Sequence, residues 1–111
     1  MLFNLNSTPS SINIAEDVRN AKVTTAVTAT STVTVLLASN AARAAISVFN
    51  SGTVDVFIRE GAAVTSALYE VKIPPQHWYK EEYSGARYTG VISCITATGS
   101  SALMVSEGTL G

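Results

Sequence analysis

The residues of this chain that could take part in catalysis are few and scattered. His77 is the single histidine, so any Ser-His-Asp or Cys-His arrangement must use it. It follows two prolines, a position that suits a loop at a sheet edge. None of its possible acidic partners stands in a recognisable nucleophile or base context. These partners are Asp17, Asp55, Glu81 and Glu82. We interpret His77 as a surface or interface residue, with catalysis or metal binding as the alternative.

The other reactive side chains also lack a catalytic context. Glu81 and Glu82 are adjacent, so in a strand they would point to opposite faces and could not flank one scissile bond without a bulge. Cys94 is the only cysteine and lies in the apolar run 91–98. We therefore expect a buried, inert thiol, with no disulfide within the chain and no cysteine-based zinc site. The glycines are spaced singly, without a phosphate-binding loop. The sequence predicts no enzyme, no catalytic residue, no cofactor and no metal.

The composition indicates surfaces that meet other protein. Charged residues make up 14% of the 111 residues, against roughly 25% in typical soluble domains. The formal net charge is −1, and the lysines and arginines are scattered, so the basic stripe that phosphate binding needs is missing. We expect no nucleic acid as a partner and, since no apolar run approaches membrane-spanning length, no membrane. An oligomer or a component of a protein lattice fits this composition.

Most of the chain follows the period-two pattern of β-strands. Apolar and other residues alternate in 33–37, 46–49 and 54–59, which places successive side chains on opposite faces of a sheet. We also predict strands in 65–73, 91–98 and 102–106 and a hairpin turn at 50–53. Over 38–45 we predict a loop or single turn, with a helix as the alternative. The sequence thus predicts an all-β fold, an antiparallel β-sandwich or small β-barrel, formed by one domain spanning residues 21–111.

Residues 1–20 differ from the rest and are predicted to form an extended N-terminal arm. The segment begins with an apolar group, Leu2, Phe3 and Leu5, and continues with a turn or linker composition. An arm of this kind either frays or docks on a neighbour. We favour docking because these three side chains would otherwise be exposed, and we name them as interface candidates.

Aromatic residues gather in the polar segment that follows the prolines. This cluster consists of four residues, His77, Trp78, Tyr79 and Tyr83, and is joined by Tyr88, with Lys80 and Arg87 between. Tryptophan and tyrosine beside polar groups can pack the end of a sandwich core, anchor a protein interface or stack on a sugar. All three interpretations stay open, and the four residues are the second group of interface candidates.

Two longer stretches carry a resemblance to a known family. In residues 36–61, Asn40 and Arg43 form an Asn-x-x-Arg sequence, followed by an apolar strand that ends at an asparagine and a second strand that ends in glycine. Residues 69–107 add a turn with proline, a Tyr-x-Gly sequence before an apolar strand, and a closing strand with Glu107. This pattern, over residues 33–108, resembles small structural proteins of tailed bacteriophages. It departs from them at Ala41, where a proline is often expected, and leaves residues 1–32 unmatched.

The resemblance implies a non-enzymatic virion component with a β-sandwich fold. The role expected is that of a capsid decoration (cement) protein, made in the host cytoplasm and located on the capsid surface. Such a protein would oligomerise, with a homotrimer favoured, and would bridge subunits of the major capsid protein. The alternative is a tail, neck or fibre component with a glycan- or receptor-binding role.

Overall fold

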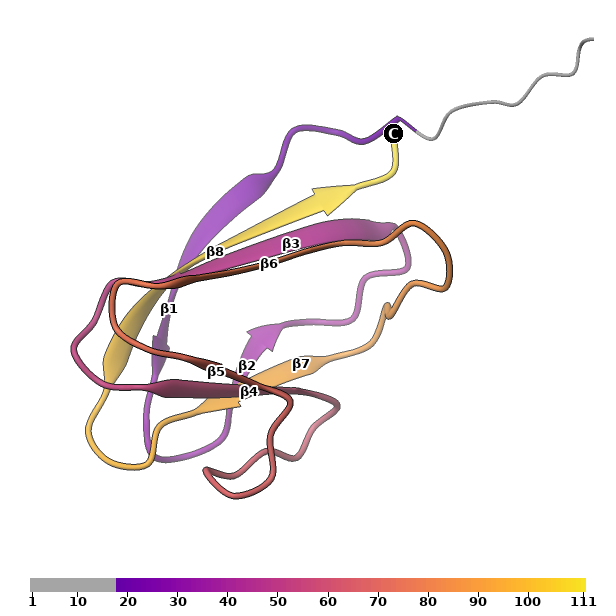
Figure 1. The fold of residues 1–111 in the computed structure, drawn as a ribbon. Helices are drawn as coiled ribbons and strands as arrows, with labels where there is room; N and C mark the ends of the chain where they lie inside the picture. The colour runs from indigo at the N-terminus through magenta and orange to yellow at the C-terminus, as the bar shows by residue number, and fades with distance from the viewer. Residues whose placement is uncertain (1–17) are drawn as a thin grey trace, which may run out of the picture.

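The protein folds as two facing β-sheets of four strands each (Figure 1). The computed structural model describes residues 18–111. One sheet has the strand order β1-β8-β3-β6 and the other β2-β7-β4-β5. The strands are β1 (Val23–Ala29), β2 (Thr34–Leu37), β3 (Arg43–Asn50), β4 (Val56–Glu60), β5 (Val71–Ile73), β6 (Trp78–Glu82), β7 (Ile92–Ile95) and β8 (Ser101–Thr109). This arrangement confirms the predicted all-β class and shows that it is a sandwich.

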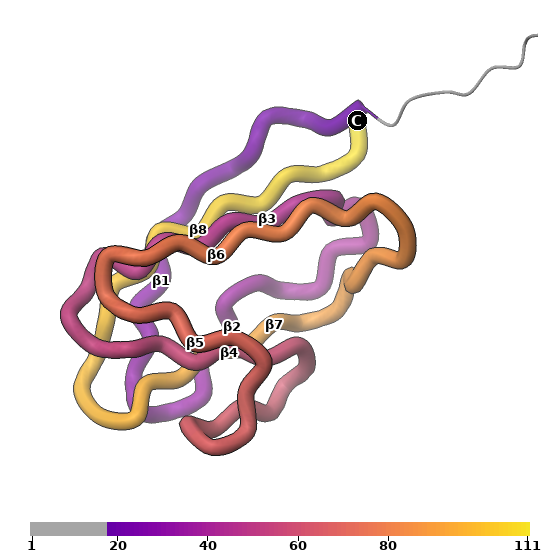
Figure 2. The backbone as a smooth tube through the Cα atoms, viewed as in Figure 1, coloured from indigo at the N-terminus to yellow at the C-terminus, as the bar shows by residue number. Residues whose placement is uncertain are grey.

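The strand pairing is that of a jelly roll. Strands of the first half pair antiparallel with strands of the second half in reverse order, β1 with β8, β2 with β7, β3 with β6 and β4 with β5. Rolling this double ribbon adds two further antiparallel pairs, β3 with β8 and β4 with β7. The chain path in Figure 2 shows the roll, with the first and last described residues side by side. Eight strands wound in this way define the jelly-roll sandwich.

The core lies between the two sheets and is built by alternate residues of most strands; in β2 the register shift lets the consecutive Leu36 and Leu37 both enter it. In β3, Ile46 and Val48 face inward, and in β8, Leu103 and Val105 do so; each is at most 2% exposed. Burial of such apolar surface stabilises the fold by roughly 25 cal/mol per Å². The opposite sheet contributes Leu36, Leu37, Val56, Ile58, Ile73, Ile92 and Cys94 to the same cluster.

A fully buried arginine fixes one end of the sandwich. Arg43 is 0% exposed, and its Nε donates to Glu107 Oε2 of β8 at 2.7 Å. Its Nη1 donates to the carbonyl oxygens of Tyr88 (3.1 Å) and Gly90 (2.8 Å), and its Nη2 to that of Ala38 (2.6 Å). Arg43 thereby ties the β2–β3 and β6–β7 connections to β8.

Two neighbouring side chains complete this network. The Nδ2 of Asn40 donates to Glu107 Oε1 at 3.2 Å, while its Oδ1 accepts from the backbone N–H of Ala42 at 3.0 Å. Arg87 Nη1 donates to the carbonyl oxygen of Arg43 at 2.9 Å. Both carboxylate oxygens of Glu107 are therefore occupied by donors from the start of β3 and the loop before it.

A buried asparagine has the equivalent position at the other end of β3. Asn50 is 0% exposed, and its Nδ2 donates to the carbonyl oxygens of Val54 and Ile73, both at 2.8 Å. Its Oδ1 accepts from the N–H of Gly52 at 3.0 Å and from the hydroxyl of Ser101 at 2.6 Å. All four hydrogen-bonding positions of the amide are used, and they join the two sheets.

The prediction of a strand over 65–73 is wrong for most of its length. Only Val71–Ile73 is a strand, and the segment before it turns over the outer face of its own sheet. There Val64 is 1% exposed, and the ring of Tyr69 packs on Phe57 with centroids 4.8 Å apart. Gly61, with φ +103°, allows the sharp departure from β4. In this segment, packing of side chains such as Tyr69 on the outer face of the sheet determines the conformation, despite the strand-like alternation of apolar and polar residues.

Two other boundaries also differ from expectation. The predicted loop over 38–45 ends early, because β3 begins at Arg43. At the start of the domain, the N–H of Asn20 donates to the carbonyl oxygen of Thr109 at 2.7 Å. Arg19 forms an isolated antiparallel β-bridge with Leu110. Residues 18–20, which we assigned to the arm, therefore pair with the C-terminal residues. The remaining part of the predicted arm lies outside the described residues.

We predict that Arg43→Ala lowers the free energy of unfolding by about 3–5 kcal/mol, because it leaves Glu107 Oε2 and three carbonyl groups without their donor. Glu107→Gln keeps an acceptor oxygen but leaves the buried guanidinium without a counter-charge, so it should also be destabilising. Urea unfolding monitored by circular dichroism measures both. Arg59→Ala is the matched control: Arg59 makes one hydrogen bond, to the Ala63 carbonyl, and its loss should cost about 1 kcal/mol. Equal costs for the two arginines would contradict the role given to Arg43.

Candidate interaction surfaces

The aromatic cluster of residues 77–83 divides between the two faces of β6. Tyr79 points inward and packs against the core, so the adjacent Trp78 points outward and is 58% exposed. Tyr83 follows the strand and is half-buried, with a buried hydroxyl that has no hydrogen-bond partner in the described residues. His77 is exposed, and its Nδ1 lies 2.9 Å from the carbonyl oxygen of Pro75. The four predicted residues therefore do not form one surface.

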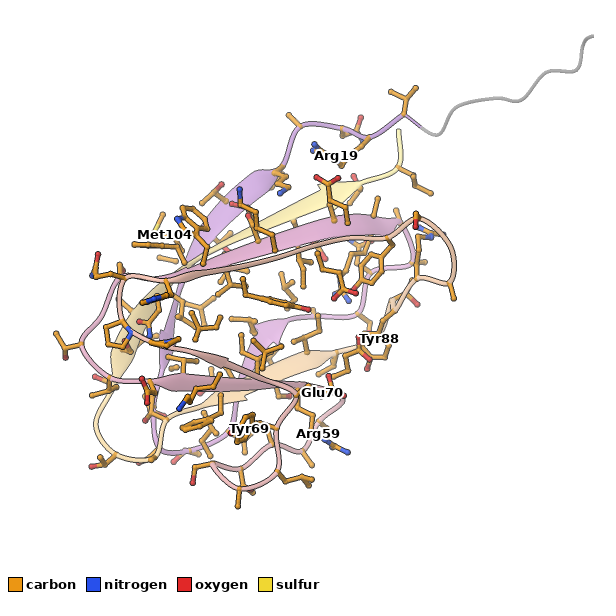
Figure 3. All side chains as sticks on the ribbon, viewed as in Figure 1. Arg19, Arg59, Tyr69, Glu70, Tyr88 and Met104 are labelled. Atoms are coloured by element: carbon orange, nitrogen blue, oxygen red, sulfur yellow. The ribbon has the colours of Figure 1, made fainter. Side chains whose placement is uncertain are left out.

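Trp78 instead belongs to a row of apolar side chains that crosses its whole sheet. The register places Trp78 opposite Phe49, Phe49 opposite Met104, and Met104 opposite Ala26. Each has neighbours along its strand that face the core, so all four face outward. The rings of Phe49 and Trp78 are 4.7 Å apart at their centroids, and Met104 is 43% exposed and lies on the outer surface in Figure 3. We call these four residues the outer apolar row.

A lysine beside the row is held against the indole. Lys80 Nζ lies 5.5 Å from the centroid of the Trp78 ring, a distance at which a cation is attracted to the ring face. Lys80 and Glu82 share the outward face of β6 with Trp78. The row is thus bordered by charge along β6, as an interface core is bordered by a polar rim.

The outer face of the second sheet also exposes apolar side chains. Val33 and Val35, before and within β2, are 41% and 54% exposed. On the same side, Leu68 and Tyr69 of the β4–β5 segment are 51% and 42% exposed. Figure 3 shows Tyr69 and Met104 on opposite sides of the sandwich. The molecule therefore carries apolar surface on both outer faces.

Sequence reasoning found Trp78 but not the residues that accompany it. Phe49 and Met104 were not among the predicted interface residues, because the runs around them predicted buried faces. The available signal was an apolar residue at the outward position of each alternation, between core residues of the same strand. The predicted arm residues Leu2, Phe3 and Leu5 lie outside the described part of the chain.

Three glutamate carboxylates lie close to Tyr79 and Tyr83 in the space between the two sheets. Glu60, Glu70 and Glu81 line a hollow between the sheets together with Tyr79 and Tyr83. Tyr79 Oη donates to Glu81 Oε1 at 2.5 Å. Burial, and then the charges of Glu70 and Glu81, raise the pKa of Glu60 above its ordinary value. Burial and the Glu81 carboxylate likewise raise the pKa of both tyrosines.

The structure does not bring the chemically reactive residues together. Within residues 18–111, no group of three or more His, Cys, Asp or Glu side chains is placed to hold a metal ion. In the same range the only ion pair joins Arg43 to Glu107, so no carboxylate contacts His77. Cys94 is 0% exposed, and burial raises the pKa of its thiol to about 11. No helix long and apolar enough to cross a membrane is found in the described chain.

Comparison with solved structures finds a distant likeness in fold. No protein-family model matches the chain, and no curated protein matches it. A solved structure from the work "Bacillus endospore appendages form a novel family of disulfide-linked pili" aligns with a TM-score of 0.44 and 15% sequence identity. The alignment covers 96% of this chain and 100% of that chain.

We predict that Glu60→Gln stabilises the protein at neutral pH. A carboxyl whose pKa is raised by folding destabilises the folded state while it is ionised, and this cost disappears as the pH falls below about 4. The gain from glutamine should therefore be largest at neutral pH and vanish in acid. Thermal unfolding across this pH range measures the gain, with Glu82→Gln, which removes an exposed outward carboxylate, as the control. A gain that grows on acidification would contradict the assignment.

We also predict that Cys94 does not react with a thiol-specific reagent in the native protein. Its burial excludes the reagent, and the raised pKa of the thiol keeps the reactive thiolate scarce at neutral pH. Absorbance of the released thiol product should report no reaction in buffer and one thiol per chain in denaturant. Rapid labelling of the folded protein would contradict the buried position.

Proposed function

We propose that the protein is a non-enzymatic structural subunit of a bacteriophage virion, which packs against other virion proteins through the outer faces of its sheets. The observation that carries this proposal is the outer apolar row. Trp78, Phe49 and Met104 lie side by side on the outward face of three neighbouring strands, and Trp78 and Met104 are well exposed. Contiguous apolar surface of this kind marks a site of protein contact.

The residue types of the row support a protein partner. Aromatic residues and methionine are enriched at the centre of protein interfaces, where charged residues are depleted. Tryptophan in particular carries a large share of binding energy when a partner covers it. The low overall charge of the chain, 14%, agrees with a molecule whose surface is largely covered.

The bacteriophage assignment rests on the resemblance of residues 33–108 and is supported by the fold. The jelly roll is common among viral capsid domains, although lectin domains and enzymes also use it. The residues that carry the resemblance have a structural role here: Asn40, Arg43 and Glu107 form the buried network. The resemblance therefore concerns residues that hold the fold together. The assembly role is argued from the outer faces of the sheets.

Within the virion we favour the capsid surface, where the protein would act as a decoration subunit that oligomerises and bridges major capsid subunits. A location in the neck, tail or fibre would use the same faces. Glycan binding requires Trp78 and Tyr79 to be exposed together, and the two residues point to opposite faces of β6. We therefore do not advance glycan binding as a second function.

The proposal is tested by co-sedimentation of the purified protein with empty capsid shells. The double variant Trp78→Ser, Met104→Ser should fold normally, because both side chains face outward, and should bind shells about thirtyfold more weakly or worse. Val18→Ser is the matched control, since Val18 is 69% exposed but lies away from the row. Unchanged binding of the double variant, or no binding of the wild-type protein to any virion component, would overturn the proposal.

A further inference from the structure

The four edge strands of the sandwich differ in how they are protected against pairing with another strand. Natural sheets block their edges with charge, proline, bulges or short strands. Strand β6 carries three consecutive charged residues (80–82), and β5 has three residues and is followed by Pro74. Strand β2 has four residues, and its register shifts between Val35 and Leu37. Each of these three edges has a recognisable block.

Strand β1 lacks all of these protections. It has seven residues with the sequence VTTAVTA, which contains no charge and no proline. Its register with β8 is regular from Val23 to Ala29, and its side chains are exposed over most of its length. No other described residue pairs with its outer edge. This edge offers backbone donors and acceptors along a stretch of β-branched residues, the arrangement to which a further strand is readily added.

We propose, building on the assembly role above, that β1 pairs antiparallel with β1 of a second copy of this chain, about a two-fold axis at Ala26. Ala26 is the middle residue of the strand, so this register pairs all seven residues and keeps outward side chains outward. Thr24 then lies opposite Thr28 of the partner subunit, and Thr25 opposite Val27 of the partner subunit. In this register β1 can therefore pair along its full length with an identical strand.

Charge and surface continuity favour a second copy over another strand. The nearest charged residue, Lys22, falls opposite Thr30 of the partner subunit, so the two lysines lie at opposite ends of the paired strands. The two four-stranded sheets merge into one sheet of eight strands, and Ala26 joins the outer apolar row of one copy to that of the other. The result is a dimer with one continuous apolar face, whereas the sequence resemblance favoured a trimer.

The test is the mass of the purified full-length chain in solution, measured by light scattering across a range of concentrations. We expect a species of about twice 11.6 kDa that Ala26→Lys converts to the monomer, because two lysines would face each other across the axis. Val35→Lys, which adds the same charge to an exposed position on the blocked edge β2, should leave the dimer intact. Mixing Ala26→Lys with Ala26→Glu should restore it.

Oxidative cross-linking tests the register itself. Ala26→Cys should form a covalent dimer on mild oxidation, while Val35→Cys should not, and the buried Cys94 does not interfere. A monomer at all concentrations, a trimer, or a dimer that survives Ala26→Lys would overturn the inference. These outcomes concern the isolated chain, so they are distinguishable from a failure of the proposed function, which is measured by binding to shells.

Discussion

The structure depends on one ion pair, between the fully buried Arg43 at the start of β3 and the partly exposed Glu107 in β8. Removing a guanidinium group from water is costly unless its N–H groups and its charge are all matched inside the protein. Here the carboxylate and three backbone carbonyls provide the partners. Because those carbonyls belong to two different connections, the cost of burial is offset only when the roll is closed. The pair thus couples the folding of distant segments and specifies one arrangement of the strand connections.

Polar side chains inside the sandwich fix the arrangement of its strands, so the outer faces of the sheets remain available for contacts with other proteins. Asn50 joins the two sheets at the other end of β3, so both ends of this central strand are fixed by buried polar groups. The outer faces carry exposed apolar residues, among them Trp78, Met104 and Val35. The residues on which we base the proposed resemblance, Asn40, Arg43 and Glu107, belong to this internal network, whereas the surfaces proposed for assembly lie elsewhere.

The sequence predicted the fold class well because its main signal is local. The alternation in 46–49 and 54–59 reflects one buried face per strand, and the structure has strands there. The segment 65–73 was mispredicted because Tyr69 packs on Phe57 outside the sheet, a contact that alternation does not encode. Strand β6 was not predicted, because its three charged residues interrupt the alternation of apolar and polar side chains. The burial of Arg43 was beyond local reasoning, since Glu107 is 64 residues away. The outer apolar row depends on register across strands, which a single sequence does not contain.

The central claim is that the outward face carrying Trp78 is covered by protein in the assembled particle. Trp78 is the only tryptophan of the chain and is 58% exposed in the isolated molecule, so a fluorinated tryptophan incorporated at this position reports on that face alone. Fluorine resonance spectra and solvent-induced shifts should show an accessible indole in the free protein. In protein bound to virion shells the account predicts a shifted resonance that no longer responds to solvent. An indole equally accessible in both states would contradict it.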